Sequence, residues 1–156
     1  MRIYNNPPVV FLVLVFAVTL LVVAISGADS PSAAQPGLAL APESILPDVV
    51  LTYAEPRTVE AYRFAAANPH LLTHQPCYCG CNMMHDSNEA CFIQDIAEDG
   101  TITFDLHAVS CGVCVDIALD VKRMTEEGHS QLAIRHYIDD AYSAVGPSTD
   151  TAMPEG

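Results

Sequence analysis

The sequence predicts a small, mainly α-helical domain with a cysteine-rich loop and a short β-hairpin, preceded by an N-terminal hydrophobic signal or anchor helix. Three observations lead to this prediction. Apolar residues recur at helical spacing in three stretches of the chain. All six cysteines lie between residues 77 and 114, and an apolar run occupies the N-terminus.

The N-terminal segment, residues 1–28, is expected to be a signal peptide or a membrane anchor. An apolar run extends over residues 9–25 and is followed by the small residues 26–28, which suit a cleavage site. The run falls between the ~7–15 apolar residues of a signal peptide and the ~20 of a spanning helix. Because Arg2 lies on the short N-terminal side, the rest of the chain is expected outside the cytoplasm. The protein is therefore predicted to be exported, either anchored at the cell membrane facing outward or secreted or periplasmic after cleavage.

The chain is acidic, with a net charge of −13. Arg2 is the only charged residue of the segment 1–28, so the remainder carries five basic and nineteen acidic residues. A domain of this charge repels phosphate backbones, which excludes nucleic acid from the expected partners.

The segments that flank the predicted domain are rich in proline and small residues. Residues 29–47 contain four prolines among Ser, Ala and Gly, and are expected to form a linker. Residues 147–156 are expected to form a flexible tail. The folded, cysteine-rich domain is predicted to occupy residues 48–146.

Three helices are predicted within this domain. The first begins at Pro56 and ends before Asn68, which a proline follows. The second begins near Cys114 and stops at Gly128. The third is capped by Ser130 and continues with apolar residues at i, i+3, i+4, i+7, i+8 and i+11 from residue 134.

A short β-hairpin is predicted between the cysteine-rich loop and the second helix. Residues 93–96 and 101–104 flank the turn Glu98-Asp99-Gly100. The same stretch partly matches a calcium-binding EF-hand loop. Ala97 and Leu106 stand where carboxylate ligands are required, however, so a turn is the better interpretation.

The cysteines form two groups rich in soft donor atoms. Residues 76–81 read Pro-Cys-Tyr-Cys-Gly-Cys and are followed by two methionines and His85, while Cys111-Gly112-Val113-Cys114 opens the second helix. Thiolates and thioethers select copper(I), zinc or iron–sulfur clusters over calcium and magnesium. A helix N-terminus also favours the thiolate form that metals bind. The predicted metal ligands are Cys77, Cys79, Cys81, His85, Cys91, Cys111 and Cys114.

Other side chains near the cysteines are weaker ligand candidates than this set. His107 is the second nitrogen candidate after His85, and His74 is a weaker one. Tyr78 is expected to shield the site from solvent. His70, His129 and His136 are expected to be ordinary surface or packing residues.

The chain resembles a family of exported bacterial proteins defined by the PCYCGC motif, which is intact at residues 76–81. The likeness continues through residues 88–92, 111–116 and 127–139, within a span of roughly residues 59–142. The resemblance implies an extracytoplasmic location and a common fold, and gives no reaction. Many members are lipoproteins, but no cysteine closely follows the apolar run here, so no lipid attachment is expected.

Two alternatives to a metal site remain open from the sequence. Six cysteines in a small exported protein also suit three disulfides, which would make the domain a stapled interaction module, or one bridge beside a site of four thiols. Cys77, Cys79 and Cys81 cannot readily pair with one another, because i, i+2 bridges are strained. Cys111 and Cys114 also suit thiol–disulfide exchange, although the later strands of a thioredoxin fold have no counterpart in the residues after Cys114.

The favoured function is an extracytoplasmic copper(I) carrier or scavenger, with zinc as the alternative metal. The cysteines with their neighbouring Met and His offer more soft donors than the four ligands of a zinc site require. The expected partners are the metal ion, a membrane metalloprotein or metal transporter, and the membrane itself through the N-terminal segment. No nucleophile–base pair, phosphate loop or paired acid–base carboxylates stand out, so no enzymatic activity is expected unless the thiols are redox-active.

Overall fold

A computed structural model of the chain describes residues 37–80 and 84–155. The predicted signal or anchor segment, the first part of the linker, and Cys81 lie outside the described residues. Within the described ranges, none of the helices combines the length and the apolar character needed to cross a membrane.

The first predicted helix is confirmed as α3, Pro56–Ala67. Pro56 occupies its first turn, where a missing N–H costs nothing, and the backbone leaves helical geometry at Asn68. Its inner face buries Tyr62 and Phe64 completely. The ring of Tyr62 packs edge-on against Phe92, with centroids 5.0 Å apart.

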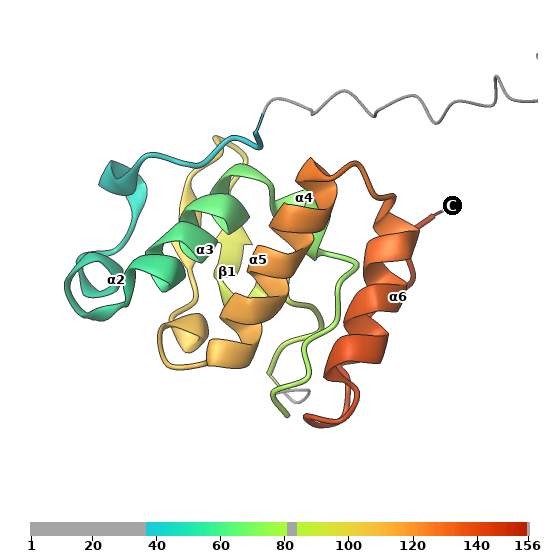
Figure 1. Ribbon diagram of the computed structural model, residues 1–156. Coiled ribbons are helices and arrows are strands. Elements are labelled where there is room, and N and C mark those ends of the chain that lie inside the picture. Colours follow the sequence, from blue (N-terminus) through green and yellow to red (C-terminus); the bar gives the residue numbers. More distant parts are fainter. Residues whose placement is uncertain (1–36, 81–83, 156) are drawn as a thin grey trace, which may run out of the picture. The chain divides into compact units, whose positions relative to one another are not determined.

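The other two predicted helices are also confirmed, as α5 (Gly112–Glu126) and α6 (Gln131–Tyr142). Gly128 adopts a left-handed φ of 85°, which lets the chain turn between them. Ser130 then caps α6 by accepting a hydrogen bond from the Ala133 N–H. Helix α5 lies between α3 and α6 and packs against both (Figure 1).

The predicted hairpin is present as β1 (Ile93–Ile96) and β2 (Ile102–Phe104), paired antiparallel. Gly100 takes the left-handed conformation of its turn, and Asp99 accepts a hydrogen bond from the Thr101 N–H at 2.9 Å. About half of the described residues are helical, and the hairpin forms a small two-stranded sheet beside the helices.

Several short elements were not predicted. They are η1 (Glu43–Ile45), α2 (Asp48–Tyr53), α4 (Pro69–Leu72), η2 (Glu89–Cys91) and η3 (His107–Val109). Each has six residues or fewer, too short for a periodic pattern to reveal it.

The domain extends beyond the boundaries expected from composition. On its N-terminal side, the Ala41 N–H donates to the carbonyl of Arg63 at 2.9 Å, and Ala41 and Leu46 are buried. The last residues of the expected linker are therefore packed against the domain, because their apolar side chains cover α3.

The C-terminal residues also lie against the domain where a flexible tail was expected. Thr149 is 3% exposed. The Arg135 guanidinium donates to the carbonyls of His74, Thr151 and Ala152 at 3.0, 3.1 and 3.2 Å, and pairs with Asp139. This one side chain on α6 holds the tail beside the segment that leads into the cysteine motif.

We predict that Arg135→Ala destabilises the protein and releases the tail. Three carbonyls would lose their charged donor, and breaking such buried contacts costs about 2–4 kcal/mol. Urea unfolding and hydrogen exchange of residues 147–155 measure both effects.

The control is Arg57→Ala, which removes an exposed ion pair with Asp116. It should cost less than about 1 kcal/mol, because solvent screens such pairs. If the two variants lost the same free energy of unfolding, the role given to Arg135 would be contradicted.

Candidate metal centre

Two parts of the chain that are distant in sequence meet at Asn88. The backbone N–H of Asn88 donates to the Gln75 carbonyl at 2.7 Å, and its side-chain amide donates to the Cys114 carbonyl at 3.2 Å. Asn88 is completely buried. It therefore fixes the residues on either side of the PCYCGC motif against the first turn of α5.

Four donors form what we call the outer set: Cys79, His107, Cys111 and Cys114. Their ligand atoms all lie within 4.8 Å of one another. Cys114 Sγ lies 3.2 Å from Cys111 Sγ and 3.7 Å from Cys79 Sγ, and Cys79 Sγ lies 3.4 Å from His107 Nε2. Ligands around a tetrahedral ion with ~2.3 Å bonds are about 3.5–3.8 Å apart, so this arrangement needs little adjustment to hold one ion.

Three thiols form the inner set: Cys77, Cys91 and Cys114, whose Sγ atoms also lie within 4.8 Å of one another. All three residues are completely buried. Cys77 Sγ lies 3.3 Å from Cys114 Sγ and 3.2 Å from Cys79 Sγ. Cys114 therefore belongs to both sets, and Cys77 contacts a member of each.

Two histidines lie on one side of the thiols. His85, Cys91 and His107 form a third group within the same 4.8 Å limit, and the two imidazole rings pack edge-on at 4.9 Å. Asp105 lies 3.5 Å from His85 Nε2 and accepts a hydrogen bond from the backbone N–H of His107 at 2.7 Å. A carboxylate beside the ring nitrogen of a histidine, as Asp105 is beside His85, is the usual outer partner of a metal ligand.

The described thiols are not joined by disulfides. The closest sulfur atoms, such as those of Cys111 and Cys114, are 3.2 Å apart, whereas a disulfide bond measures about 2.05 Å. The described sulfurs thus converge on one region.

The structure brings together six of the seven residues predicted as ligands; the seventh, Cys81, lies outside the described residues. His107, ranked second from the sequence, contributes to two of the three donor groups. Met84 is 71% exposed and belongs to none of them. His74 instead lies 3.3 Å from the Ala152 carbonyl in the tail.

The Tyr78 side chain, expected to shield the site, is directed to α6, where its ring stacks on Tyr142. Its hydroxyl donates to Asp139 on α6 at 2.7 Å, and the residue is 6% exposed. Burial and this hydrogen bond raise the pKa of Tyr78 to about 12. The Tyr78 hydroxyl is therefore neutral at physiological pH.

The tail fixes the backbone of Cys77, which sequence reasoning did not anticipate. The Cys77 N–H donates to Thr149 Oγ1, and the Thr149 N–H donates to the Cys77 carbonyl, both at 2.9 Å. Gly146 lets the chain approach Tyr78 closely, because a Cβ there would lie 2.8 Å from the Tyr78 carbonyl oxygen. No local signal marks these contacts, since the residues are about seventy positions apart.

The pKa values of two buried thiols, Cys77 and Cys114, are shifted in opposite directions. Hydrogen bonds from the Cys114 thiol and from Cys91 hold the pKa of the Cys77 thiol well below its usual range. The same hydrogen bonding, together with burial, raises the pKa of the Cys114 thiol. The arrangement therefore favours one thiolate, at Cys77, and a neutral thiol at Cys114.

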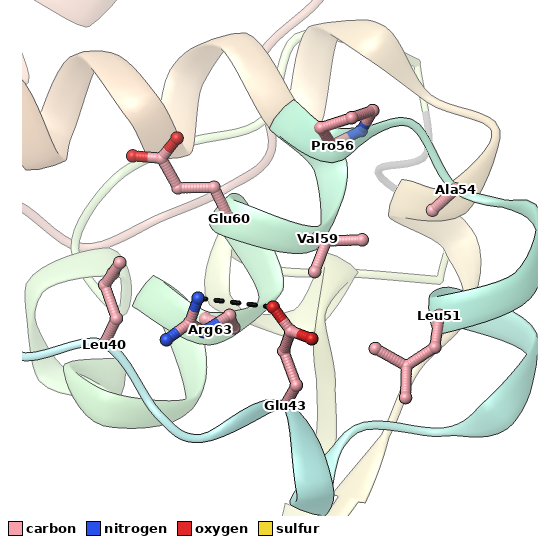
Figure 2. A pocket seen from close by; sticks show the side chains of 8 residues that line it. All are labelled: Leu40, Glu43, Leu51, Ala54, Pro56, Val59, Glu60 and Arg63. Atoms are coloured by element: carbon pink, nitrogen blue, oxygen red, sulfur yellow. Dashed lines mark hydrogen bonds and ion pairs between the residues drawn. The ribbon is translucent and has the colours of Figure 1, made fainter.

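A pocket of about 450 Å³ lies elsewhere on the domain, between the N-terminal segment, α2 and α3 (Figure 2). Arg63 crosses it to pair with Glu43 at 3.5 Å. The lining contains no cysteine or histidine, so this pocket is separate from the metal centre. The lining residues are Leu40, Glu43, Leu51, Ala54, Pro56, Val59, Glu60 and Arg63.

Comparison with known proteins gives one match. A family model described as "Protein of unknown function with PCYCGC motif" matches residues 38–154, which include both flanking segments that pack on the domain. No curated protein and no solved structure matches the chain.

We predict that Thr149→Val destabilises the protein by about 1–3 kcal/mol, because the buried Cys77 N–H loses its acceptor. Thr149→Ser keeps the hydroxyl and is the matched control. Denaturant unfolding of the metal-free protein measures both. If both variants lost the same free energy of unfolding, the hydrogen bond between the Thr149 hydroxyl and the Cys77 N–H would not stabilise the fold.

We also predict that the reduced, metal-free protein retains thiolate absorbance at about pH 6, well below the ordinary thiol pKa of about 8.5. Because the folded pKa of Cys77 is lowered, this thiolate stabilises the fold fully above the unfolded pKa. That stability is lost as the pH falls through the folded value.

The measurement is the ultraviolet absorbance of the thiolate during acidification. The Cys77→Ser substitution should abolish the absorbance that persists at about pH 6. A native protein whose thiolate absorbance vanishes near pH 8.5, as in model peptides, would contradict the charge assignment.

Proposed function

Since the chain belongs to the family of proteins of unknown function with a PCYCGC motif, whose description assigns no reaction, we propose a function from its own donor atoms. The protein binds a soft metal ion, copper(I), outside the cytoplasm and acts as a carrier or scavenger. We expect it to bind and release the ion rather than to catalyse a reaction.

The observation that carries this proposal is the outer set, with three sulfur donors and one imidazole nitrogen within 4.8 Å of one another. Sulfur donors favour soft ions over calcium and magnesium. When buried, closely packed thiols lose their protons, they create negative charge away from water. A bound cation offsets this charge.

Copper(I) is preferred to zinc because the sulfur donors exceed what one zinc ion requires. A Cys₃His set alone is a standard structural zinc site, so zinc remains the alternative. Here the completely buried Cys77 and Cys91 add two more sulfurs beside the outer set. An excess of thiolates around one position suits a soft monovalent ion.

A carrier must exchange its ion, and the outer set is accessible enough to do so. Cys79, His107 and Cys111 are partly exposed, whereas Cys114 is buried behind them. A ligand from a partner can therefore approach from the Cys79 and Cys111 side. The expected partner is a membrane metalloprotein or metal transporter. The protein would meet it while anchored in the membrane if residues 1–28 are retained, or as a released exported protein if they are cleaved.

Thiol–disulfide exchange is the second candidate, favoured by one observation. Cys111, at the start of α5, is partly exposed, and its Sγ lies 3.2 Å from Sγ of the buried Cys114. An exposed attacking thiol with a buried resolving thiol is typical of redox motifs. The two candidate functions differ in the effect of oxidation. Oxidation of a metal carrier removes its thiolate ligands, whereas an exchange protein passes between its dithiol and disulfide forms as part of its function.

Copper(I) affinity tests the proposal. The full chain, kept in detergent and reduced under anaerobic conditions, is titrated with copper(I) against a coloured copper(I) chelator. We expect tight binding that His107→Ala weakens by at least about tenfold, since loss even of an outer partner of a ligand has such an effect.

His129→Ala is the matched control, because His129 is exposed and pairs with Glu127 outside the donor groups. It should leave the affinity unchanged. Failure of the chain to compete with the chelator for copper(I), or equal effects of the two histidine variants, would overturn the proposed function.

A further inference from the structure

Cys114 lies where the outer and inner sets meet. It is one of four donors in the outer set and one of three in the inner set. Its Sγ lies 3.2 Å from Cys111 Sγ on one side and 3.3 Å from Cys77 Sγ on the other. A thiolate has several lone pairs, so one sulfur in this position is able to serve two ions.

We propose that the cluster holds two soft metal ions bridged by the Cys114 thiolate. One ion is held by the outer set and the second by the inner set of Cys77, Cys91 and Cys114. This inference rests on the proposed function and extends it from a single site to a binuclear centre.

One ion cannot use all the sulfurs that the fold brings together. Four ligands complete a tetrahedral ion, and the outer set supplies four without Cys77 or Cys91. Yet Cys77 Sγ lies within 3.3 Å of two other sulfurs, those of Cys79 and Cys114. A buried cysteine commonly serves as a small apolar residue, but packing against sulfur on two sides is a ligand arrangement rather than an apolar one.

Burial is consistent with an ion in the inner set. Thiolates formed at Cys77 and Cys91 would be completely buried, where unpaired negative charge is costly. An ion bound there would give these thiolates a partner.

The two positions differ in their access to solvent. The outer set includes the partly exposed Cys79, His107 and Cys111, whereas every residue of the inner set is completely buried. The outer ion should therefore exchange with a chelator quickly and the inner ion slowly. A carrier built in this way delivers one ion and retains the other.

The first measurement is made on the wild-type full chain in detergent, loaded with excess copper(I) under anaerobic conditions and freed of unbound metal. Elemental analysis should give two copper ions per chain. X-ray absorption should show a copper neighbour within about 4.6 Å of each copper, because both ions bond to one sulfur at about 2.3 Å.

The outcomes separate this inference from the proposed function. Two ions with a copper–copper contact support the bridged centre. One ion overturns it but leaves the proposed copper binding intact, and no ion overturns both. Two ions without a copper neighbour overturn the bridge.

A variant in the inner set gives an independent test. Cys91 belongs to the inner set and not to the outer one, so Cys91→Ala should retain one rapidly exchanging ion and lose the copper–copper contact. Cys91→Ser is the companion variant, in case one of the two substitutions disturbs the core. A folded variant that still binds two ions in contact would contradict the assignment of Cys91 to the second ion.

Discussion

The candidate metal centre depends on the position of one sulfur atom, Cys114 Sγ, at the start of α5. This thiol lies within 3.7 Å of three other sulfurs, two from the PCYCGC segment and one from Cys111 just before α5. Those segments have little regular structure of their own. They meet because α5 is fixed between α3 and α6, and because the buried Asn88 side chain bonds to the Cys114 carbonyl. The packing of the helices therefore sets the geometry of the donors.

Bringing so many thiols into the interior has an energetic consequence. The proton is lost readily at Cys77, which the neighbouring thiols stabilise as an anion, and is retained at Cys114. Each further thiolate would add like charge where no water can solvate it. A cation removes this conflict, so metal affinity and folding stability become coupled in such a site. The tail contributes from the other side, since Thr149 and Arg135 hold the cysteine segment in place.

Local signals in the sequence predicted the regular elements. Pro56, Gly128 and Ser130 mark helix ends through their own backbone and capping chemistry, which acts within a few residues. The flanking segments were less predictable, because proline- and threonine-rich stretches also occur in linkers. Their packing depends on long-range bonds such as that from the Arg135 guanidinium to the Thr151 carbonyl. The spacing of the cysteines indicated soft-metal ligands, but it did not show that Cys114 belongs to two donor groups or that Asp105 lies beside the His85 ring.

The central claim, that the cysteines converge to hold a metal ion, is tested most directly on the full chain purified anaerobically without added metal. Copper, zinc and iron are measured together with the thiols that react before and after a chelator is added. We predict bound copper, with thiols that become reactive once the chelator removes it. Absence of metal, absence of reactive thiols even after unfolding, and no uptake of copper(I) after reduction would contradict the account and favour a disulfide-stapled module.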